Sequence, residues 1–477
     1  MQMISLLFFL LVAVVFLVIY LLNRFLADKV RLVSVTKWVL LISSYLFVAY
    51  ADYRFALVLG ILTIVVWLCG RNQKYTKVGI LAAVLALAYF KYTNFFVDSF
   101  ARLLGHSDFN ALNIFVPLGI SFYTFSAISY LADVGQGKAE SRPLLDVAVY
   151  LSFFPKFTSG PIQKCEDFFT QLDKPRQVGW LSFSEGIQIF CFGLFKKMVL
   201  ADRLAVFVNQ VFATPLAFGS GTVLLAVLSY SLQIYFDFSG YSDMAIGVAR
   251  MLDIHLPRNF NLPYLSHNVT ELWKRWHITL SGWIQEYLYI PLGGNRKGQI
   301  RACINLVLTM VIGGLWHGAS WGFVLWGLLH GLALVAHKLW VKWTGANQKP
   351  RKWLPGLLSV LLTFCFTSFC WIFFRAETLS QAFAVLSQIF SLRNGISHPY
   401  LWTFVSLAIL VGCSIFCAVA TKNRTLPEHR QNTSFVEGFY PLLDLTKFWH
   451  LVLFFLFCGL LLGLAYTGSS PFIYGAF

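Results

Sequence analysis

Long apolar runs, separated by short basic or polar breaks, constrain the fold of this chain more than any other feature. A transmembrane helix needs roughly 20 apolar residues, because the bilayer core offers no partner for backbone polar groups. The predicted spans are residues 4–22, 38–50, 55–70, 78–96, 113–131, 181–200, 204–219, 222–250, 301–315, 319–341, 355–374, 400–420 and 448–467. We therefore expect an all-α polytopic membrane protein with roughly 11–13 transmembrane helices, in which the shorter runs are re-entrant or half-buried.

The composition excludes several other classes of protein. With 58% hydrophobic and 12% charged residues, the chain has too little polar surface for a soluble globule. The net charge of +16 is spread in short bursts between apolar runs, which is typical of cytoplasmic loops and not of a nucleic-acid partner. The nine cysteines form no C-x-x-C pair and lie mostly in apolar runs, so we predict reduced packing residues and neither a metal site nor a bound cofactor.

The basic residues also predict a topology. No basic residue precedes the run Met1–Leu22, whereas several follow it, which is the reverse of a cleaved signal peptide. We expect a retained first span whose N-terminus lies outside. The basic clusters Arg24–Lys37, Arg71–Lys77 and Lys138–Arg142 then all fall on the cytoplasmic side. The alternation is consistent for five spans and is not determined by the sequence after residue 146.

Two apolar segments in the middle of the chain are interrupted, one by proline and glycine and the other by basic residues. Leu151–Gly160 is apolar but is broken by proline and glycine, which indicates a re-entrant or interfacial segment that is buried in protein or lines a cavity. In the next segment, Lys196, Lys197 and Arg203 interrupt an apolar helical pattern. Long basic side chains in this setting usually extend to the interface, and we predict the same here.

Two aspartates lie inside the predicted span 222–250. Asp237 and Asp243 are six residues apart and face different directions on one helix, so a carboxylate dyad is disfavoured. Two interpretations stay open: each carboxylate pairs with a lysine or arginine, or it lines a polar tunnel.

The stretch from Asn268 to Tyr289 predicts one amphipathic helix at the membrane interface. Asn268 is a suitable N-cap and Glu271 follows three residues later. His277 adjoins the apolar stripe, so it either points into the protein or bonds a headgroup or carbonyl at the interface. Pro291–Gly298 then predicts a turn, whose amides together with Arg296 offer a weak candidate site for an anion such as phosphate.

The run Gly313–Trp326 contains the leading functional candidate. His317 is embedded in apolar sequence, where an ionisable group costs several kcal/mol unless it faces a cavity or a partner. Gly318–Gly322 fits the G-x-S-x-G string of serine hydrolases, but a nucleophilic Ser320 would need a preceding strand, and small residues here favour helix packing. His330 lies 13 residues after His317 and would face away in one straight helix, which disfavours a histidine metal cluster.

Taken in order, these motifs resemble the membrane-bound O-acyltransferase (MBOAT) superfamily, in particular its alginate O-acetyltransferase-like branch. The motifs are PLGISFYTFSAISYLAD, FFPKFTSGPIQ, QIYFDFSGYSDMAIG, NFNLPYLSHNVTELWKRWHITLSGW, YIPLGGNRKG and LWHGASWGFVLWGLLHG. The resemblance implies a single membrane domain over residues 1–477, with re-entrant and interfacial helices around a central tunnel. Its core would cover about 113–341, followed by C-terminal spans over 355–467 and an external tail, 468–477.

The resemblance also implies an activity and its residues. Its W-H-G and R-W-H contexts correspond to His317 and His277, and a histidine with a pKa near 7 is a suitable general base for an alcohol. We expect His317 to be that base and His277 to orient it or to stabilise the oxyanion. By the same resemblance, Tyr474 in the tail receives the acetyl group and passes it outward. Further substrate-binding residues expected are Trp316, Arg275, Trp276, Asn295, Arg296 and Asp237.

The expected reaction moves an acetyl group from cytoplasmic acetyl-CoA to an extracytoplasmic polysaccharide such as alginate, cellulose or peptidoglycan. The expected location is the bacterial inner membrane, among membrane lipids, with an external SGNH-like serine acetyltransferase and polysaccharide-synthesis proteins as partners. One departure is the W-x-R-D-Y motif, which here reads Trp283-Ile284-Gln285-Glu286-Tyr287. The alternatives are a D-alanyl or lipid O-acyltransferase, or a transporter, although the inverted repeats of a transporter are not visible in the sequence.

Overall fold

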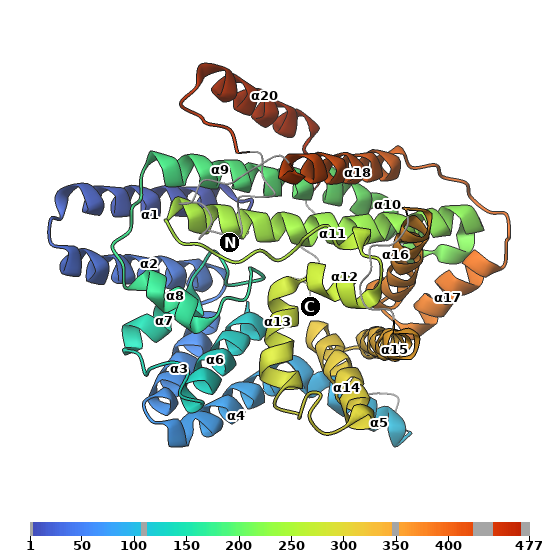
Figure 1. Ribbon diagram of the computed structural model, residues 1–477, viewed down its shortest axis with the longest axis horizontal. Coiled ribbons are helices and arrows are strands. Elements are labelled where there is room, and N and C mark those ends of the chain that lie inside the picture. The colour runs from blue at the N-terminus through green and yellow to red at the C-terminus, as the bar shows by residue number, and fades with distance from the viewer. Residues whose placement is uncertain (1–2, 106–111, 346–352, 423–441, 469–477) are drawn as a thin grey trace. The chain divides into compact units, whose positions relative to one another are not determined.

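The structure is a computed structural model that describes residues 3–105, 112–345, 353–422 and 442–468 (Figure 1). In these residues the regular structure is helical, apart from one isolated parallel bridge between Phe218 and Ile396. The predicted all-α polytopic class is therefore confirmed. Hydrophobic runs form helices here because a helix pairs nearly all its backbone polar groups within one segment.

Eight helical segments in the described residues are long and apolar enough to cross a membrane. They are Leu6–Phe25, Lys29–Ala51, Tyr53–Gly70, Gln73–Leu103, Ser220–Met251, Gln299–His317, Trp321–Thr344 and Gly356–Arg375. This is fewer than the roughly 11–13 expected. The predicted span 204–219, for example, contains only the 12-residue helix α10 (Asp202–Ala213). Hydropathy alone does not separate a short helix buried inside protein from one that spans a bilayer.

The chain forms two compact units. The first consists of residues Met1–Phe190 and Ser242–Pro257, and the second of Cys191–Tyr241 and Arg258–Phe477. Two helices, α9 (Trp180–Phe195) and α11 (Ser220–Met251), contribute residues to both units. The single membrane domain expected over the whole chain, like its central tunnel, stays a prediction.

The first unit contains the N-terminal helices and the predicted re-entrant segment. Its remaining helices are α1 (Leu6–Phe25), α2 (Lys29–Ala51), α3 (Tyr53–Gly70), α4 (Thr76–Leu87), α5 (Thr93–Leu103), α6 (Ile120–Gly135), α7 (Leu144–Ser152) and α8 (Cys165–Leu172). Helices α1 and α2 lie side by side (Figure 1).

The re-entrant segment begins where α7 ends and continues as turns through buried residues. Phe154 N donates to Ser44 Oγ at 3.1 Å, and Tyr150 Oη donates to Gln163 O at 2.8 Å. Irregular backbone at this point is thus enclosed by protein, as the sequence predicted.

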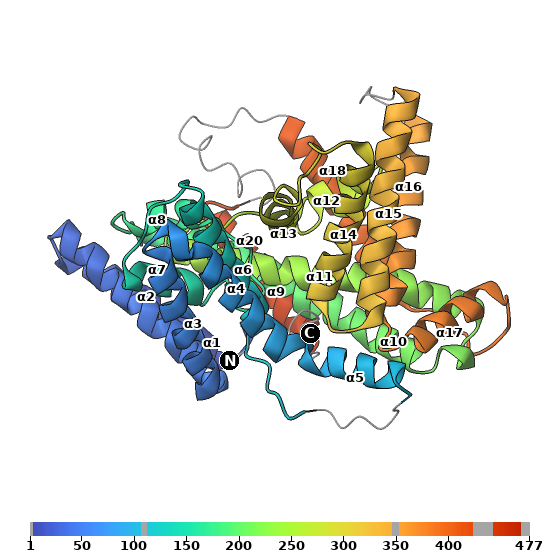
Figure 2. The same ribbon diagram turned by 90° about the horizontal axis from the view of Figure 1, so that it is seen from below.

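The second unit contains the remaining helices. They are α10, α12 (Val269–Arg275), α13 (Ile278–Ile284), α14 (Gln299–His317), α15 (Trp321–Thr344), α16 (Trp353–Arg375), α17 (Leu379–Phe390), α18 (Leu401–Lys422) and α20 (Phe448–Leu464). Helices α14, α15 and α16 stand next to one another (Figure 2). Glycines allow α14 and α15 to approach closely: a Cβ on Gly314 would lie 3.1 Å from Gly327 Cα, and one on Gly331 would lie 2.9 Å from Val307 Cα. The small residues of this run therefore pack helices, as predicted.

One prediction about the second unit is wrong. Lys197 does not extend to an interface: its side chain is 6% exposed and lies in the π-helical segment η3 (Lys196–Ala201). Its Nζ is 2.6 Å from Asp237 Oδ1 and 2.8 Å from Asp202 Oδ1. Two carboxylates converge on this ammonium, so the side chain is stable when buried and does not extend to the interface. The sequence pattern could not show this convergence.

Candidate active site

His277 lies at a break between two short helices. Asn268 caps α12 as predicted, since its Oδ1 accepts from Glu271 N at 2.9 Å. The expected continuous helix to Tyr289 is wrong, however, because α12 ends at Arg275 and His277 adopts a left-handed backbone with φ of 43°. A non-glycine residue in this conformation stores strain of about 1–3 kcal/mol, a feature that clusters at functional sites.

The break is caused by a preceding loop. Ile278 N donates to Asn259 O at 2.9 Å, and Asn261 N donates to Arg275 O at 2.9 Å. The loop thereby supplies partners for backbone groups that a continuous helix would have paired within itself.

The side chain of Asn259 fixes the tautomer of His277. Asn259 Oδ1 accepts from Thr279 Oγ1 at 2.9 Å and from Thr279 N at 3.4 Å, so the oxygen is the atom that faces this cluster. His277 Nδ1 is 2.9 Å from the same oxygen and therefore donates to it, which leaves the lone pair on Nε2. His277 is 1% exposed, and burial lowers its pKa to about 3, so the ring is neutral. The interfacial alternative for His277 is excluded.

His317 is the last residue of α14. The chain leaves the helix at Gly318 and re-enters a helix at Trp321, with Ser320 as the N-cap that accepts from Gly322 N at 3.2 Å. Ser320 is thus a capping residue preceded by a helix and not a nucleophile after a strand, as expected. His317 is 3% exposed.

An aromatic cluster surrounds His317 and connects it to His277. The His317 ring lies edge-on to Trp316, Trp326 and Phe374, with centroids 4.9, 5.1 and 5.2 Å away. The Trp316 ring is also 6.3 Å from the His277 ring. Trp316 therefore contacts both histidines, and the second unit brings together two residues that are forty positions apart in sequence.

The model of the MBOAT, membrane-bound O-acyltransferase family matches residues 65–376, a range that includes both histidines. The chain belongs to this family. It is 42% identical to the peptidoglycan O-acetyltransferase of Helicobacter pylori and 38% identical to the probable alginate O-acetylase of Pseudomonas aeruginosa. These matches cover 68% and 74% of this chain and 66% and 69% of those relatives.

A more distant relative has a different printed activity. The teichoic acid D-alanyltransferase of Bacillus subtilis is 28% identical over 56% of this chain and 70% of its own length. The family thus includes transfer of acetyl and of D-alanyl groups, so membership by itself leaves the acyl group open.

Besides Trp316, three of the predicted substrate residues lie in or near the histidine cluster of this O-acyltransferase family member. Trp276 is buried with its ring 5.0 Å from Trp371. Arg275 is held by Glu271 at 2.7 Å, and Asp237 is held by Lys197. These ion pairs favour the interpretation of Asp237 as a structural partner over a role in lining a tunnel.

Asn295 and Arg296 lie at the other end of the α14–α15 hairpin. Asn295 Oδ1 accepts from Tyr289 Oη at 2.8 Å and from Lys338 Nζ at 2.7 Å, in a turn where Gly293 and Gly294 have positive φ. From Gln299 to His317, α14 rises roughly 27 Å. The structure therefore does not bring this turn to His317, and substrate binding by Asn295 and Arg296 stays a prediction.

Sequence reasoning missed Trp326 and His330. The centroid of the Trp326 ring is 5.1 Å from that of His317 and 5.0 Å from that of His330. The expectation that His330 faces away from the cluster is therefore wrong. That prediction assumed one straight helix from His317 to His330. Instead, α14 ends before Gly318, Ser320 caps α15, and α15 runs back along α14. The capping residue Ser320 was the available signal.

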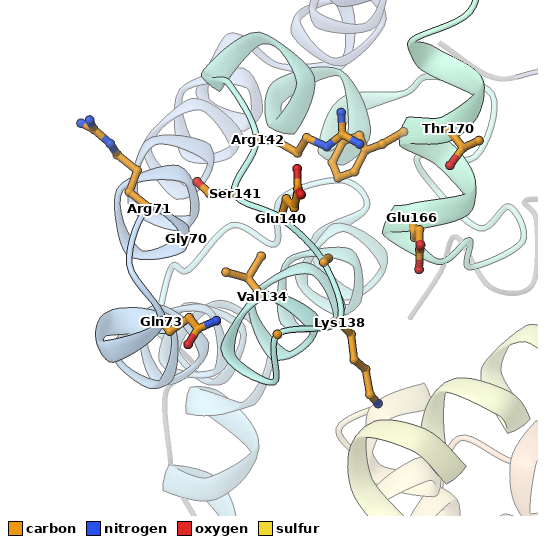
Figure 3. A pocket seen from close by; sticks show the side chains of 13 residues that line it. Gly70, Arg71, Gln73, Val134, Lys138, Glu140, Ser141, Arg142, Glu166 and Thr170 are labelled. Carbon is orange, nitrogen blue, oxygen red and sulfur yellow. The ribbon is translucent and has the colours of Figure 1, made fainter.

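A cavity of about 650 Å³ lies in the first unit and contains none of the predicted site residues (Figure 3). Arg71, Lys138 and Arg142 line it, and Arg142 also binds Asp173, which binds Lys37. All three basic clusters that were predicted to be cytoplasmic are thus represented at one place in this unit. Figure 3 shows Glu140 and Arg142 near the centre of the cavity, whereas Arg71 and Lys138 point away from it.

Proposed function

We propose that this protein is an O-acetyltransferase that transfers an acetyl group from cytoplasmic acetyl-CoA for the O-acetylation of an extracytoplasmic polysaccharide. The observation that carries the proposal is the contact of His277 and His317 with the same indole, Trp316, inside the region matched to the family. The printed names of the two relatives, peptidoglycan O-acetyltransferase and probable alginate O-acetylase, support acetyl as the group and a glycan as the acceptor.

His317 is the proposed general base. It removes the proton of an acceptor hydroxyl while the oxygen attacks the thioester carbon; the acetyl–sulfur bond breaks, and the proton passes to the departing thiolate. The products are an acetyl ester and a free thiol. A neutral imidazole performs this role best, and His317 is buried against three aromatic rings that hold it in place.

His277 is the proposed orienting residue. Its Nδ1 proton is committed to Asn259, so in the neutral ring Nε2 accepts a hydrogen bond and cannot donate one. An oxyanion needs donors. Two roles were expected for His277: orienting His317 or stabilising the oxyanion. The first fits this tautomer, and the second does not.

The outward relay belongs to the same proposal. Tyr474 lies outside the described residues, and its part is inferred from the resemblance alone: it accepts the acetyl group and passes it to a separate SGNH-like serine acetyltransferase. The inner membrane is the proposed location, because the donor is cytoplasmic and the acceptor is outside. A Tyr474→Phe variant that acetylates polymer normally in cells would exclude the relay.

The test uses purified protein with radiolabelled acetyl-CoA. His317→Ala should reduce acetyl transfer about 10²–10⁴-fold, the usual contribution of a general base. His267→Ala is the matched control, because this exposed histidine lies in the same segment as His277. Wild-type rates for a folded His317→Ala protein would refute the assignment. A wild-type protein that ignores acetyl-CoA but accepts a D-alanyl thioester would instead favour the activity printed for the Bacillus subtilis relative.

A further inference from the structure

Two buried N–H donors on α15 lack an acceptor among the described residues. They are Trp326 Nε1 and His330 Nε2, one helical turn apart, with ring centroids separated by 5.0 Å. Both side chains are 1% exposed. Neither donor belongs to the roles already given to His277 and His317.

The hydrogen-bond pattern shows that His330 Nε2 carries a proton. Trp273 Nε1 donates to His330 Nδ1 at 3.4 Å, and an indole nitrogen is a donor only. His330 Nδ1 must therefore be the acceptor. The neutral ring then has its proton on Nε2, which makes that atom a donor.

Leaving both donors unpaired is unfavourable, since each buried unsatisfied group costs about 1–3 kcal/mol. The same cluster does satisfy another indole: Trp371 Nε1 donates to Tyr264 Oη at 3.1 Å, while the Trp371 ring stacks on Trp326 at 5.7 Å. Two unsatisfied donors beside a satisfied one point to an acceptor supplied by a bound molecule.

The position of the donors indicates which part of a substrate they meet. Trp326 adjoins His317, but His330 lies on the far side of Trp326, so an acceptor held there is removed from the reacting carbon. Beyond His330, α15 continues to His337, which bonds Thr270, and to Lys338 and Lys342. The end of α15 away from His317 is therefore basic and suited to a phosphorylated group.

We propose that Trp326 and His330 bind an amide carbonyl in the arm that carries the donor thioester. Among the described residues, the rings in contact with this pair are aromatic, and the pair offers N–H groups and no charge, which suits a neutral carbonyl oxygen and not a carboxylate or phosphate. This inference rests on the proposed function. It assigns to α15 the recognition of the donor arm, while His317 acts on the hydroxyl.

The test compares two acetyl donors of matched length on the same protein preparation. S-acetyl-N-acetylcysteamine has one amide in its arm, and S-pentyl thioacetate has only methylene groups. Trp326→Phe keeps an aromatic ring and removes the N–H, and His330→Phe removes the second donor. Within one variant, the ratio of kcat/KM for the two donors is independent of the folded fraction, so partial misfolding does not obscure the result.

We expect each variant to lower kcat/KM for the amide donor about three- to tenfold more than kcat/KM for the alkyl donor, mainly through KM. His330→Gln, which retains a donor, should recover part of the loss. Trp371→Phe, the control with an internally satisfied indole, should affect both donors equally. An equal effect of Trp326→Phe on both donors, as expected if the N–H groups only bind water, would overturn the inference. If wild type uses acetyl-CoA but does not favour the amide thioester over the alkyl one, the inference fails and the proposed function stands. If wild type transfers acetyl neither from these thioesters nor from acetyl-CoA, the proposed function fails as well.

Discussion

Each compact unit buries a lysine, and the two units stabilise it differently. In the second unit, Lys197 lies between the carboxylates of Asp202 and Asp237. In the first unit, Lys156 is equally buried, but its Nζ has no hydrogen-bond partner among the described residues. It lies 4.1 Å from the ring centre of Tyr150 and 4.8 Å from that of Phe168.

The difference shows what keeps a buried ammonium charged. Two carboxylates compensate the lost hydration of Lys197 directly. Aromatic faces compensate less, and burial lowers the pKa of Lys156 to about 7. Lys197 thus acts as a fixed ionic crosslink between η3, α10 and α11, whereas Lys156 is a site where protonation changes near neutral pH.

The largest expected effect comes from removing the paired lysine. Lys197→Met leaves two carboxylates buried without their common partner and should reduce the free energy of unfolding by about 3–5 kcal/mol. Denaturation in detergent, followed by tryptophan fluorescence, measures it. Lys196→Met is the control, because that neighbour is less buried and should change stability much less. Equal stability of the Lys197→Met protein and wild type would show that Lys197 is not needed to compensate the two buried carboxylates.

Removing the lysine held by aromatic rings should have the opposite sign. Lys156→Met exchanges a buried amine for an apolar side chain of similar length and should raise the free energy of unfolding at pH 7 by about 1–3 kcal/mol. The folded-state pKa is depressed from 10.5 to about 7, so the gain is complete below pH 7 and disappears as the pH rises toward 10.5. Unfolding midpoints at pH 7 and pH 9.5 test both the sign and the trend. A destabilised variant at pH 7 would show that the aromatic contacts outweigh desolvation.

Near neutral pH, the smallest effect concerns His277, a buried titratable group of the second unit. Its pKa is lowered from 6.5 to about 3, so its contribution to stability is present above pH 6.5 and is lost as the pH falls toward 3. The slope approaches about 1.4 kcal/mol per pH unit within that window. His277→Asn keeps an amide that can donate to Asn259 and should remove this part of the pH dependence. An unchanged pH profile would mean that His277 does not titrate in the unfolding transition.

Much of the local structure could be predicted from the sequence. The cap at Asn268, the end of the helix before Pro155 and the small-residue packing of α14 and α15 depend on residues a few positions apart. The histidines were identified because an imidazole in apolar sequence is unusual, and the W-H-G and R-W-H contexts resembled a family. The family match includes both positions.

The site itself was less predictable. The break at His277 depends on Asn259, eighteen residues earlier, and periodicity carries no information on such a pairing. The contact of Trp326 with His317 depends on the reversal at Gly318–Ser320. For Lys197 the local pattern suggested an interfacial side chain, since Asp237 lies forty residues further along the chain.

By itself, the sequence determined that this chain is a helical membrane protein with two unusual histidines, because hydrophobic burial and backbone pairing follow from neighbouring residues. The contacts between polar groups that are distant in sequence depended on the tertiary packing. It set the tautomer of His277, enclosed His317 in indole and phenyl rings, and left the N–H groups of Trp326 and His330 without an acceptor among the described residues. Hydrogen bonds and ion pairs require atoms within about 3 Å, and that proximity is fixed by how distant segments pack.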